Sequence, residues 1–187
     1  MNNHKFVLKS LSIFVILFVL SAFTKNTLKE SKQEVQKITK AICILYPTQG
    51  NKVNGIITFT LTENKIHVTG DIHGLTKGKH GFHIHEFGDC SAPDGSSAGG
   101  HFNPDKMEHA GPMSPMRHEG DMGNIEADAN GNVHLDYMDA MISFEGKNSI
   151  IGRGVIVHEK EDDFHTQPTG NAGARVANGV IGIAKGD

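Results

Sequence analysis

Two groups of residues have the types and spacing of metal ligands. His83 and His85 lie two positions apart in an alternating apolar segment. On a β-strand such a pair projects from one face, so both imidazoles can share one metal ion. A second group follows along the chain: His101, His109, His118 and Asp121. Three imidazoles and one carboxylate suit a closed tetrahedral zinc site.

Both groups also have a plain interpretation. A pair of histidines two residues apart arises from ordinary polar alternation, and a histidine-rich loop can simply be solvated. The second group lies in residues 86–123, a stretch rich in Gly, Pro, Ser and His with almost no apolar periodicity. A loop of that length in a compact domain is usually functional or disordered. Because it has little to bury, bound metal would supply its ordering energy, and we interpret it as functional.

Short strands must position these ligands. Strict alternation at residues 66–72 and 133–137 predicts half-buried strands. Further strands are expected at residues 41–46, 55–61, 81–85, 124–127, 141–144, 150–158 and 180–184. Gly-rich turns join them, without an intervening helical pattern. We therefore expect an all-β fold, an antiparallel Greek-key barrel or sandwich of about eight strands with long metal-binding loops.

The composition limits the classes of function. The 187 residues are typical of one domain, since domains commonly span roughly 100 to 200 residues. The formal charge of −3 lacks the broad positive field of a nucleic-acid binder, so no nucleic-acid partner is expected. The chain contains 12 histidines, and histidine is the commonest metal ligand.

The N-terminus has the pattern of a targeting segment. Two lysines precede an apolar run at residues 11–20, which is shorter than the ~20 residues of a membrane-spanning helix. We expect residues 1–24 to be a signal peptide or N-terminal anchor, 25–39 a polar linker and 40–187 the folded domain. The protein would then be exported, periplasmic or extracellular, and in contact with a membrane only if the N-terminus is uncleaved.

Five separated motifs resemble those of copper/zinc superoxide dismutases. They occur in the family's order and close to its spacing: HGFHIHEFGD at 80–89, GHFNP at 100–104, HEGDMGN at 118–124, VIVHE at 155–159 and GNAGAR at 170–175. The chain resembles an exported, bacterial-type member of this family. The resemblance implies an antioxidant enzyme that converts superoxide to O2 and H2O2 with copper and zinc as cofactors.

The resemblance also assigns metal ligands. It implies that copper is held by His83, His85, His101 and His158. It implies that zinc is held by His101, His109, His118 and Asp121. The shared residue, His101, would leave copper and take up a proton when that metal is reduced. Copper would be the redox centre, and zinc would maintain geometry and charge.

Two charged residues match further family positions. Arg175 resembles the active-site arginine, a fixed cation that attracts and orients the anionic substrate. Asp162 matches a carboxylate that hydrogen-bonds one copper-ligand and one zinc-ligand histidine, here His83 and His109. The neighbouring Asp163 is the alternative for this second role.

The resemblance implies partners as well. Superoxide is the expected substrate. Residues 150–152 and 180–183 look like the dimer contacts of many relatives, so a homodimer is expected.

Three features depart from the family pattern. The segment 163–170 is shorter than the loop that carries guiding charges in many relatives. Cys90 resembles the family's disulfide cysteine, but Asn178 stands at its partner's place. A bridge from Cys43 to Cys90 is one alternative, and burial of Cys43 as an apolar residue is the other. Four methionines in the zinc loop suggest either gap-filling or soft contacts for incoming Cu(I): Met107, Met113, Met116 and Met122.

Two other functions could use the same histidines. A zinc hydrolase or hydratase would activate water with His83, His85 and a third histidine, but this leaves His158 and the second group unexplained. A periplasmic metal buffer or copper-delivery domain would keep the barrel. Loss of a copper ligand or of the arginine would favour it, and both are retained.

Overall fold

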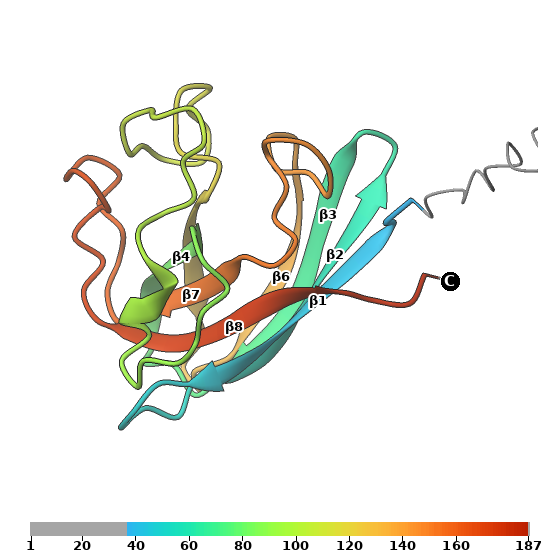
Figure 1. Ribbon diagram of the computed structural model, residues 1–187. Helices are drawn as coiled ribbons and strands as arrows, with labels where there is room; N and C mark the ends of the chain where they lie inside the picture. The colour runs from blue at the N-terminus through green and yellow to red at the C-terminus, as the bar shows by residue number, and fades with distance from the viewer. Residues whose placement is uncertain (1–36, 187) are drawn as a thin grey trace, which may run out of the picture. The chain divides into compact units, whose positions relative to one another are not determined.

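The computed structural model describes residues 37–186 (Figure 1). In this range the chain forms the strands β1 (Lys40–Pro47), β2 (Asn54–Thr62), β3 (Lys65–His73), β4 (Gly78–His85), β5 (Asp121–Ala127), β6 (Val133–Asp139), β7 (Gly154–His158) and β8 (Arg175–Ile183), with one 3₁₀ turn, η1 (Ser96–Ala98). No helix within residues 37–186 is long and apolar enough to cross a membrane. The predicted signal segment 1–24 and most of the linker at 25–39 lie outside the described residues.

The strands form one antiparallel sheet that curls into a nearly closed barrel (Figure 1). Their order is β5-β4-β7-β8-β1-β2-β3-β6. Three consecutive strands, β1 to β3, are neighbours, whereas the chain then crosses to β4 and later returns through β7 and β8 beside β1. These crossovers are those of a Greek key, and the predicted fold class is confirmed.

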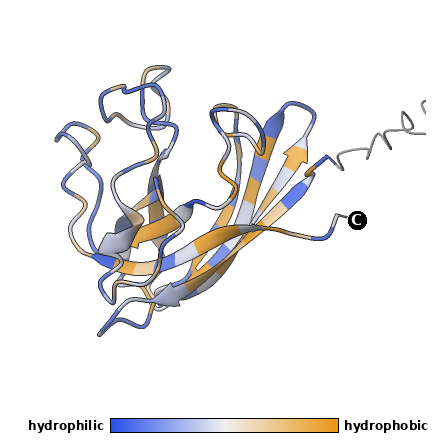
Figure 2. Ribbon diagram, in the orientation of Figure 1, coloured by the Kyte–Doolittle hydropathy of each residue, from blue (hydrophilic) through white to orange (hydrophobic). Residues whose placement is uncertain are grey.

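Apolar and polar residues alternate along the strands (Figure 2). The apolar side chains of one face fill the interior of the barrel. On β2, Ile57 and Phe59 are fully buried, whereas Ile56 between β2's inward positions is half exposed. Successive strand side chains point to opposite faces, so every second residue reaches the core. The largest fully buried apolar side chains are Phe59, Phe82, Leu45, Ile57, Ile66, Ile72, Ile84, Ile150, Ile156 and Ile181.

Two of the expected strands are wrong in whole or in part. Residues 141–144 turn instead, because the Asp139 carboxylate accepts backbone hydrogen bonds from residues 141 and 142 at 2.7 and 3.0 Å. The strand expected at 150–158 begins only at Gly154, after a turn in which Gly152 has a φ of 77°. Loop side chains in these regions are buried in the core: Ile142, Phe144 and Ile150. Burial of loop residues therefore produced the apolar pattern that predicted strands.

The long β4–β5 connection is bound to the barrel through backbone groups. The N–H of Ile84 donates to the Gly120 carbonyl at 2.9 Å, and the N–H of Phe102 donates to the Ile84 carbonyl at 2.9 Å. A Cβ at Gly120 would overlap the Ile84 carbonyl oxygen. Only glycine allows this approach. The loop therefore lies close to β4, the strand that carries the first histidine pair.

Candidate metal centre

Four histidine rings converge where β4, β7 and the long loop meet. β4 contributes His83 and His85, and His158 ends the adjacent strand β7. His101 comes from the loop and forms an isolated bridge with His85. One ligand atom of each of the four lies within 4.8 Å of the others. All four side chains are buried, so the structure brings together the residues expected to hold copper.

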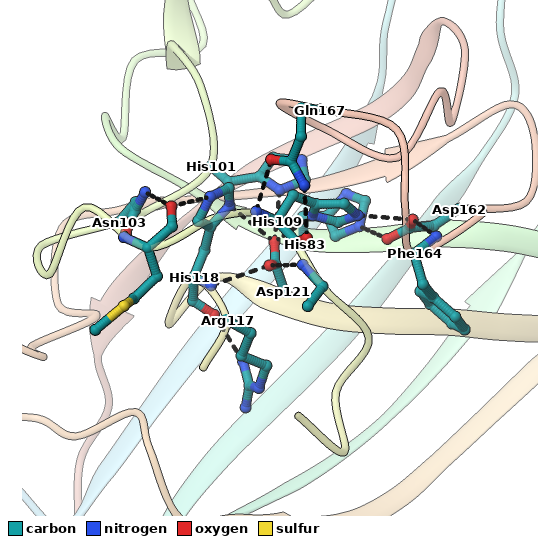
Figure 3. A network of polar contacts seen from close by, with 12 residues as sticks. His83, His101, Asn103, His109, Arg117, His118, Asp121, Asp162, Phe164 and Gln167 are labelled. Carbon is teal, nitrogen blue, oxygen red and sulfur yellow. Dashed lines mark hydrogen bonds and ion pairs between the residues drawn. The ribbon is translucent and has the colours of Figure 1, made fainter. Parts of the chain in front are cut away.

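The second group converges on one carboxylate (Figure 3). Asp121 Oδ1 lies 2.7 Å from His101 Nδ1, 2.9 Å from His109 Nδ1 and 3.1 Å from His118 Nδ1. The ligand atoms of these four buried residues all lie within 4.8 Å of one another. His101 belongs to both groups, because its Nδ1 faces Asp121 while the ring also lies beside His83 at a centroid distance of 4.0 Å.

The inner nitrogens of the first group have no hydrogen-bond partner. They are His83 Nδ1, His85 Nε2, His101 Nε2 and His158 Nε2. The outer nitrogens are occupied: the N–H of His85 Nδ1 donates to the Gly99 carbonyl at 3.0 Å, and that of His158 Nδ1 to the Gly173 carbonyl at 3.2 Å. A neutral imidazole has one N–H, so donation outward leaves a lone pair inward. Four lone pairs directed at one site fit a bound metal ion.

Asp162 joins the two groups. Its Oδ2 accepts from His83 Nε2 at 2.7 Å and its Oδ1 accepts from His109 Nε2 at 2.9 Å. The Asn124 amide holds the Asp162 backbone on both sides, accepting from its N–H and donating to its carbonyl at 2.8 Å each. Asp163, the alternative, is exposed and accepts hydrogen bonds within its own loop.

Arg175 lies beside the first group. Its Nη1 and Nη2 donate to the carbonyls of Gly95 and Gly99 at 2.5 and 2.6 Å. The Gly99 carbonyl also accepts from His85, so the guanidinium and a first-group imidazole share one acceptor. The positive charge contributes, after burial and the neighbouring histidines, to lowering the pKa of both His85 and His158.

Sequence reasoning assigned no role to three residues that support this centre. Buried Arg117 pairs with Asp139 at 2.6 Å and donates to the carbonyl of His118 at 3.0 Å, which anchors a ligand segment. Asn124 and Gln167 bind the backbones of centre residues through their amides. Nothing in the sequence identifies such contacts. Some join residues that are distant along the chain, and others are made to main-chain carbonyls, which every residue has.

Burial keeps three of the imidazoles neutral, those of His85, His101 and His158. It lowers the pKa of His101 to about 4 and that of His158 to about 3. Burial also acts against ionisation of Asp121, but hydrogen bonds from His101, His109 and His118 outweigh it and hold this pKa well below its usual range. Near neutral pH the imidazoles of His85, His101 and His158 are therefore uncharged and the Asp121 carboxylate is ionised, which are the states that bind metal. His109 differs: although burial acts to lower its pKa, hydrogen bonds to Asp121 and Asp162 raise this pKa to about 9, so metal binding would displace its extra proton.

The sulfur-containing residues settle two open alternatives. Cys43 and Cys90 are both free thiols, so the Cys43–Cys90 bridge is not formed, and Cys43 is a buried apolar residue. Among the loop methionines only Met122 is buried and fills a gap. Met113 is 93% exposed and Met116 is 69% exposed, so the gap-filling interpretation is wrong for them.

Comparisons with known proteins identify the family that this chain resembles. A family model described as copper/zinc superoxide dismutase matches residues 53–181. The extracellular Cu-Zn superoxide dismutase of Drosophila melanogaster is 48% identical over 151 residues, which cover 75% of this chain and 82% of that protein. Cu-Zn superoxide dismutase 5 of Dictyostelium discoideum is 46% identical over 154 residues, 78% of this chain and 98% of its own. The crystal structure of the clock protein EA4 aligns with a TM-score of 0.73 and 44% identity, over 79% of this chain and 97% of that chain.

The buried histidines predict an acid-sensitive metal-free protein. The folded-state pKa values of His101 (about 4) and His158 (about 3) lie below the unfolded value near 6.5. Between these values the unfolded chain binds more protons, so the free energy of unfolding falls as pH drops from about 6.5 toward 4. Each histidine contributes up to about 1.4 kcal/mol per pH unit.

Denaturant unfolding of the metal-free protein at pH 7, 5.5 and 4.5 measures this slope. The variant His101→Gln should show a shallower slope because it lacks one of the titrating groups. Equal unfolding free energies at the three pH values would contradict the assignment.

Proposed function

The chain belongs to the copper/zinc superoxide dismutase family, and on that premise we propose how its own residues serve the two metals. When bound, copper supplies the alternating one-electron reduction and oxidation that converts superoxide to O2 and H2O2, and zinc supplies fixed positive charge and geometry. We assign copper to His83, His85, His101 and His158. We assign zinc to His101, His109, His118 and Asp121.

The four partnerless nitrogens of the first group carry this proposal. An unsatisfied buried polar atom costs about 1–3 kcal/mol, and four of them aimed at one site are explained by a ligand that accepts their lone pairs. Four imidazoles suit Cu(II). The second group differs in having a carboxylate, and three imidazoles with one aspartate suit tetrahedral zinc.

His101 is proposed to couple proton movement to the redox cycle. Its Nδ1 faces Asp121 and the zinc group, whereas its Nε2 faces the copper group. Nε2 would be a copper ligand, and whenever it does not bind the metal it would hold a proton that it can give to the reduced substrate. Nδ1 would stay with the zinc group, to which Asp121 also belongs, so the ring would remain in place between the two groups.

Arg175 is proposed to bind and orient superoxide. Its side chain donates to the carbonyls of Gly95 and Gly99, and the Gly99 carbonyl also accepts the His85 N–H. These contacts place the cation beside the proposed copper ligands. The shortened segment 163–170 contains no lysine or arginine. Attraction of the anion to the site therefore depends strongly on Arg175.

We also propose a homodimer, supported by an exposed apolar patch. The patch lies on β1, β8 and the loop after β4: Ile44, Tyr46, Phe87 and Val180, each 41–63% exposed. β1 and β8 are paired neighbours. In the segment expected to form contacts, Ile181 faces the core, whereas its neighbour Val180 faces outward. Contiguous exposed apolar side chains commonly mark an interface.

Export is proposed from the N-terminal pattern together with a relative. The Drosophila protein is named extracellular. Residues 1–24 would direct export and residues 25–39 would link them to the domain. N-terminal sequencing of the exported protein tests cleavage. Periplasmic location, membrane anchoring and the bacterial type stay predictions.

The proposed function predicts activity only with both metals. Protein loaded with copper and zinc should bind two ions per chain and remove superoxide, because each group has its own ligand set. His101→Gln should lose most of this activity, since no other residue serves both groups. Metal content and superoxide removal are measured on the same samples.

Two outcomes would favour the rival functions instead. A zinc hydrolase would be active with zinc alone and leave superoxide unchanged. A metal buffer would bind both ions without removing superoxide.

The role of Arg175 predicts a salt-dependent defect. Arg175→Ala should lower kcat/KM by about tenfold or more at low ionic strength, which corresponds to about 1.4 kcal/mol. The difference from wild type should narrow at high salt because ions screen the attraction. Arg175→Lys keeps the charge but loses the two-point contact, so its kcat/KM should lie between those of wild type and Arg175→Ala. An Arg175→Ala enzyme with full metal content and an unchanged low-salt rate would refute the role.

The apolar patch predicts a dimer that one charge disrupts. Light scattering should give twice the chain mass for the wild type. Val180→Asp should give a monomer, because a carboxylate would be buried in the apolar contact. Thr62→Asp at the exposed end of β2 is the matched control and should remain dimeric. A monomeric wild type would rule the dimer out.

A further inference from the structure

The shortened loop of residues 163–170 is organised by its own hydrogen bonds. The Asp163 carboxylate accepts from the N–H of His165 at 2.9 Å and from the N–H and hydroxyl of Thr166 at 2.8 and 2.6 Å. The Asp163 N–H donates to the Gly170 carbonyl at 2.9 Å, and the Gly170 N–H to the Thr166 carbonyl at 2.7 Å. The loop is therefore closed at its base and can present one side chain in a defined direction.

That side chain is Gln167, and it contacts the zinc group (Figure 3). The N–H of His109 donates to Gln167 Oε1 at 2.9 Å, and Gln167 Nε2 donates to the His109 carbonyl at 2.8 Å. The amide therefore satisfies one backbone donor and one backbone acceptor of the same residue. Reversing the amide would lose both bonds, so the pair fixes its orientation.

The ring of His109 is held from the other end of the same loop. Its Nε2 donates to Asp162 Oδ1 at 2.9 Å, which leaves Nδ1 directed at Asp121 Oδ1, 2.9 Å away. There is no spare room around this contact: a Cβ at Gly170 would overlap the Asp162 carboxylate and come within 2.6 Å of His109 Nε2. Main chain and ring of one zinc-group histidine are thus both restrained by residues 162–170.

We propose that Gln167 is a positioning residue for zinc, and that this short loop holds the zinc site closed. The inference rests on the zinc ligands proposed above. The Asn124 amide binds the Asp162 backbone in the same two-bond manner, so both partners of the His109–Asp162 hydrogen bond are fixed at their main chains. Without Gln167, the backbone at residue 109 can move away from Asp121, and zinc leaves faster.

The test compares zinc release from three variants of the copper- and zinc-loaded protein. Gln167→Met keeps the length of the side chain and removes both hydrogen bonds. Gln167→Glu keeps one acceptor for the His109 N–H and places a second acceptor against the His109 carbonyl. Gln49→Met, at an exposed position in another turn, is the matched control. A chromogenic chelator reports zinc release, and Co(II) in the zinc site reports ligand geometry by its visible spectrum.

We expect Gln167→Met to release zinc about tenfold faster than wild type, since loss of a group that orients a ligand typically costs 10–100-fold in affinity. Gln167→Glu should release zinc at least as fast as Gln167→Met. Both variants should shift the Co(II) bands, while copper retention and the copper spectrum stay close to wild type. Gln49→Met should match wild type in every measurement.

Three results would overturn the inference. Wild-type zinc release and an unshifted Co(II) spectrum in both Gln167 variants would show that the contact does not position His109. Equal acceleration of copper and zinc loss would indicate a general folding defect. A wild-type protein that binds copper but no zinc would remove the zinc site itself, and with it the proposed function.

Discussion

The centre depends on the direction in which buried imidazoles donate their single N–H. His85 and His158 donate outward to backbone carbonyls, and His83 donates to Asp162. Each donation leaves a lone pair on the inner nitrogen, where no protein group receives it. Burial strengthens this arrangement by disfavouring protonation of His85, His101 and His158. The oxygen atoms that accept these N–H groups therefore determine which ring nitrogens are free to bind a metal ion, although they are not ligands themselves.

The acceptors lie in the loops that follow β4 and β7, whereas the barrel places most of the rings. Adjacent strands β4 and β7 place three imidazoles on rigid elements, where sites are more precise than on loops. The loop ligands need further restraint, and polar contacts provide it: Arg117 binds the carbonyl of His118, and Gln167 binds the backbone of His109. Asp162 then links the two metal groups through one carboxylate.

Other polar contacts hold the loop after β4, where no disulfide bridge is formed. Asn178 stands where the family's second disulfide cysteine is expected, and both cysteines are free. The loop after β4 is instead held by Arg175, which donates to two of its carbonyls, and by Ser97, whose hydroxyl donates to the Asp89 carbonyl at 2.7 Å. A residue proposed to orient substrate therefore also organises the loop around it.

The sequence alone predicted the fold class, the His83–His85 pair and the four residues of the second group, and the family resemblance added His101 and His158 to the first. Strand alternation is a local property, and histidines two residues apart on a strand share a face whatever surrounds them. Local pattern failed at residues 141–144 and 150–153, where apolar loop side chains reach the core without a strand. The family resemblance favoured Asp162 over its neighbour Asp163, and the structure shows that the Asp162 carboxylate faces His83 and His109.

Only the tertiary structure decided how the ligands are oriented and held. Whether a ring nitrogen is left without a partner depends on carbonyls such as those of Gly99 and Gly173, which side-chain identity does not encode. The roles of Arg117 and Gln167 were invisible for a similar reason, because Gln167 binds main-chain atoms of the distant His109 and Arg117 is held by the distant Asp139 carboxylate. Residue types name the possible ligands, but the three-dimensional placement of donors and acceptors determines which atoms are free to bind metal.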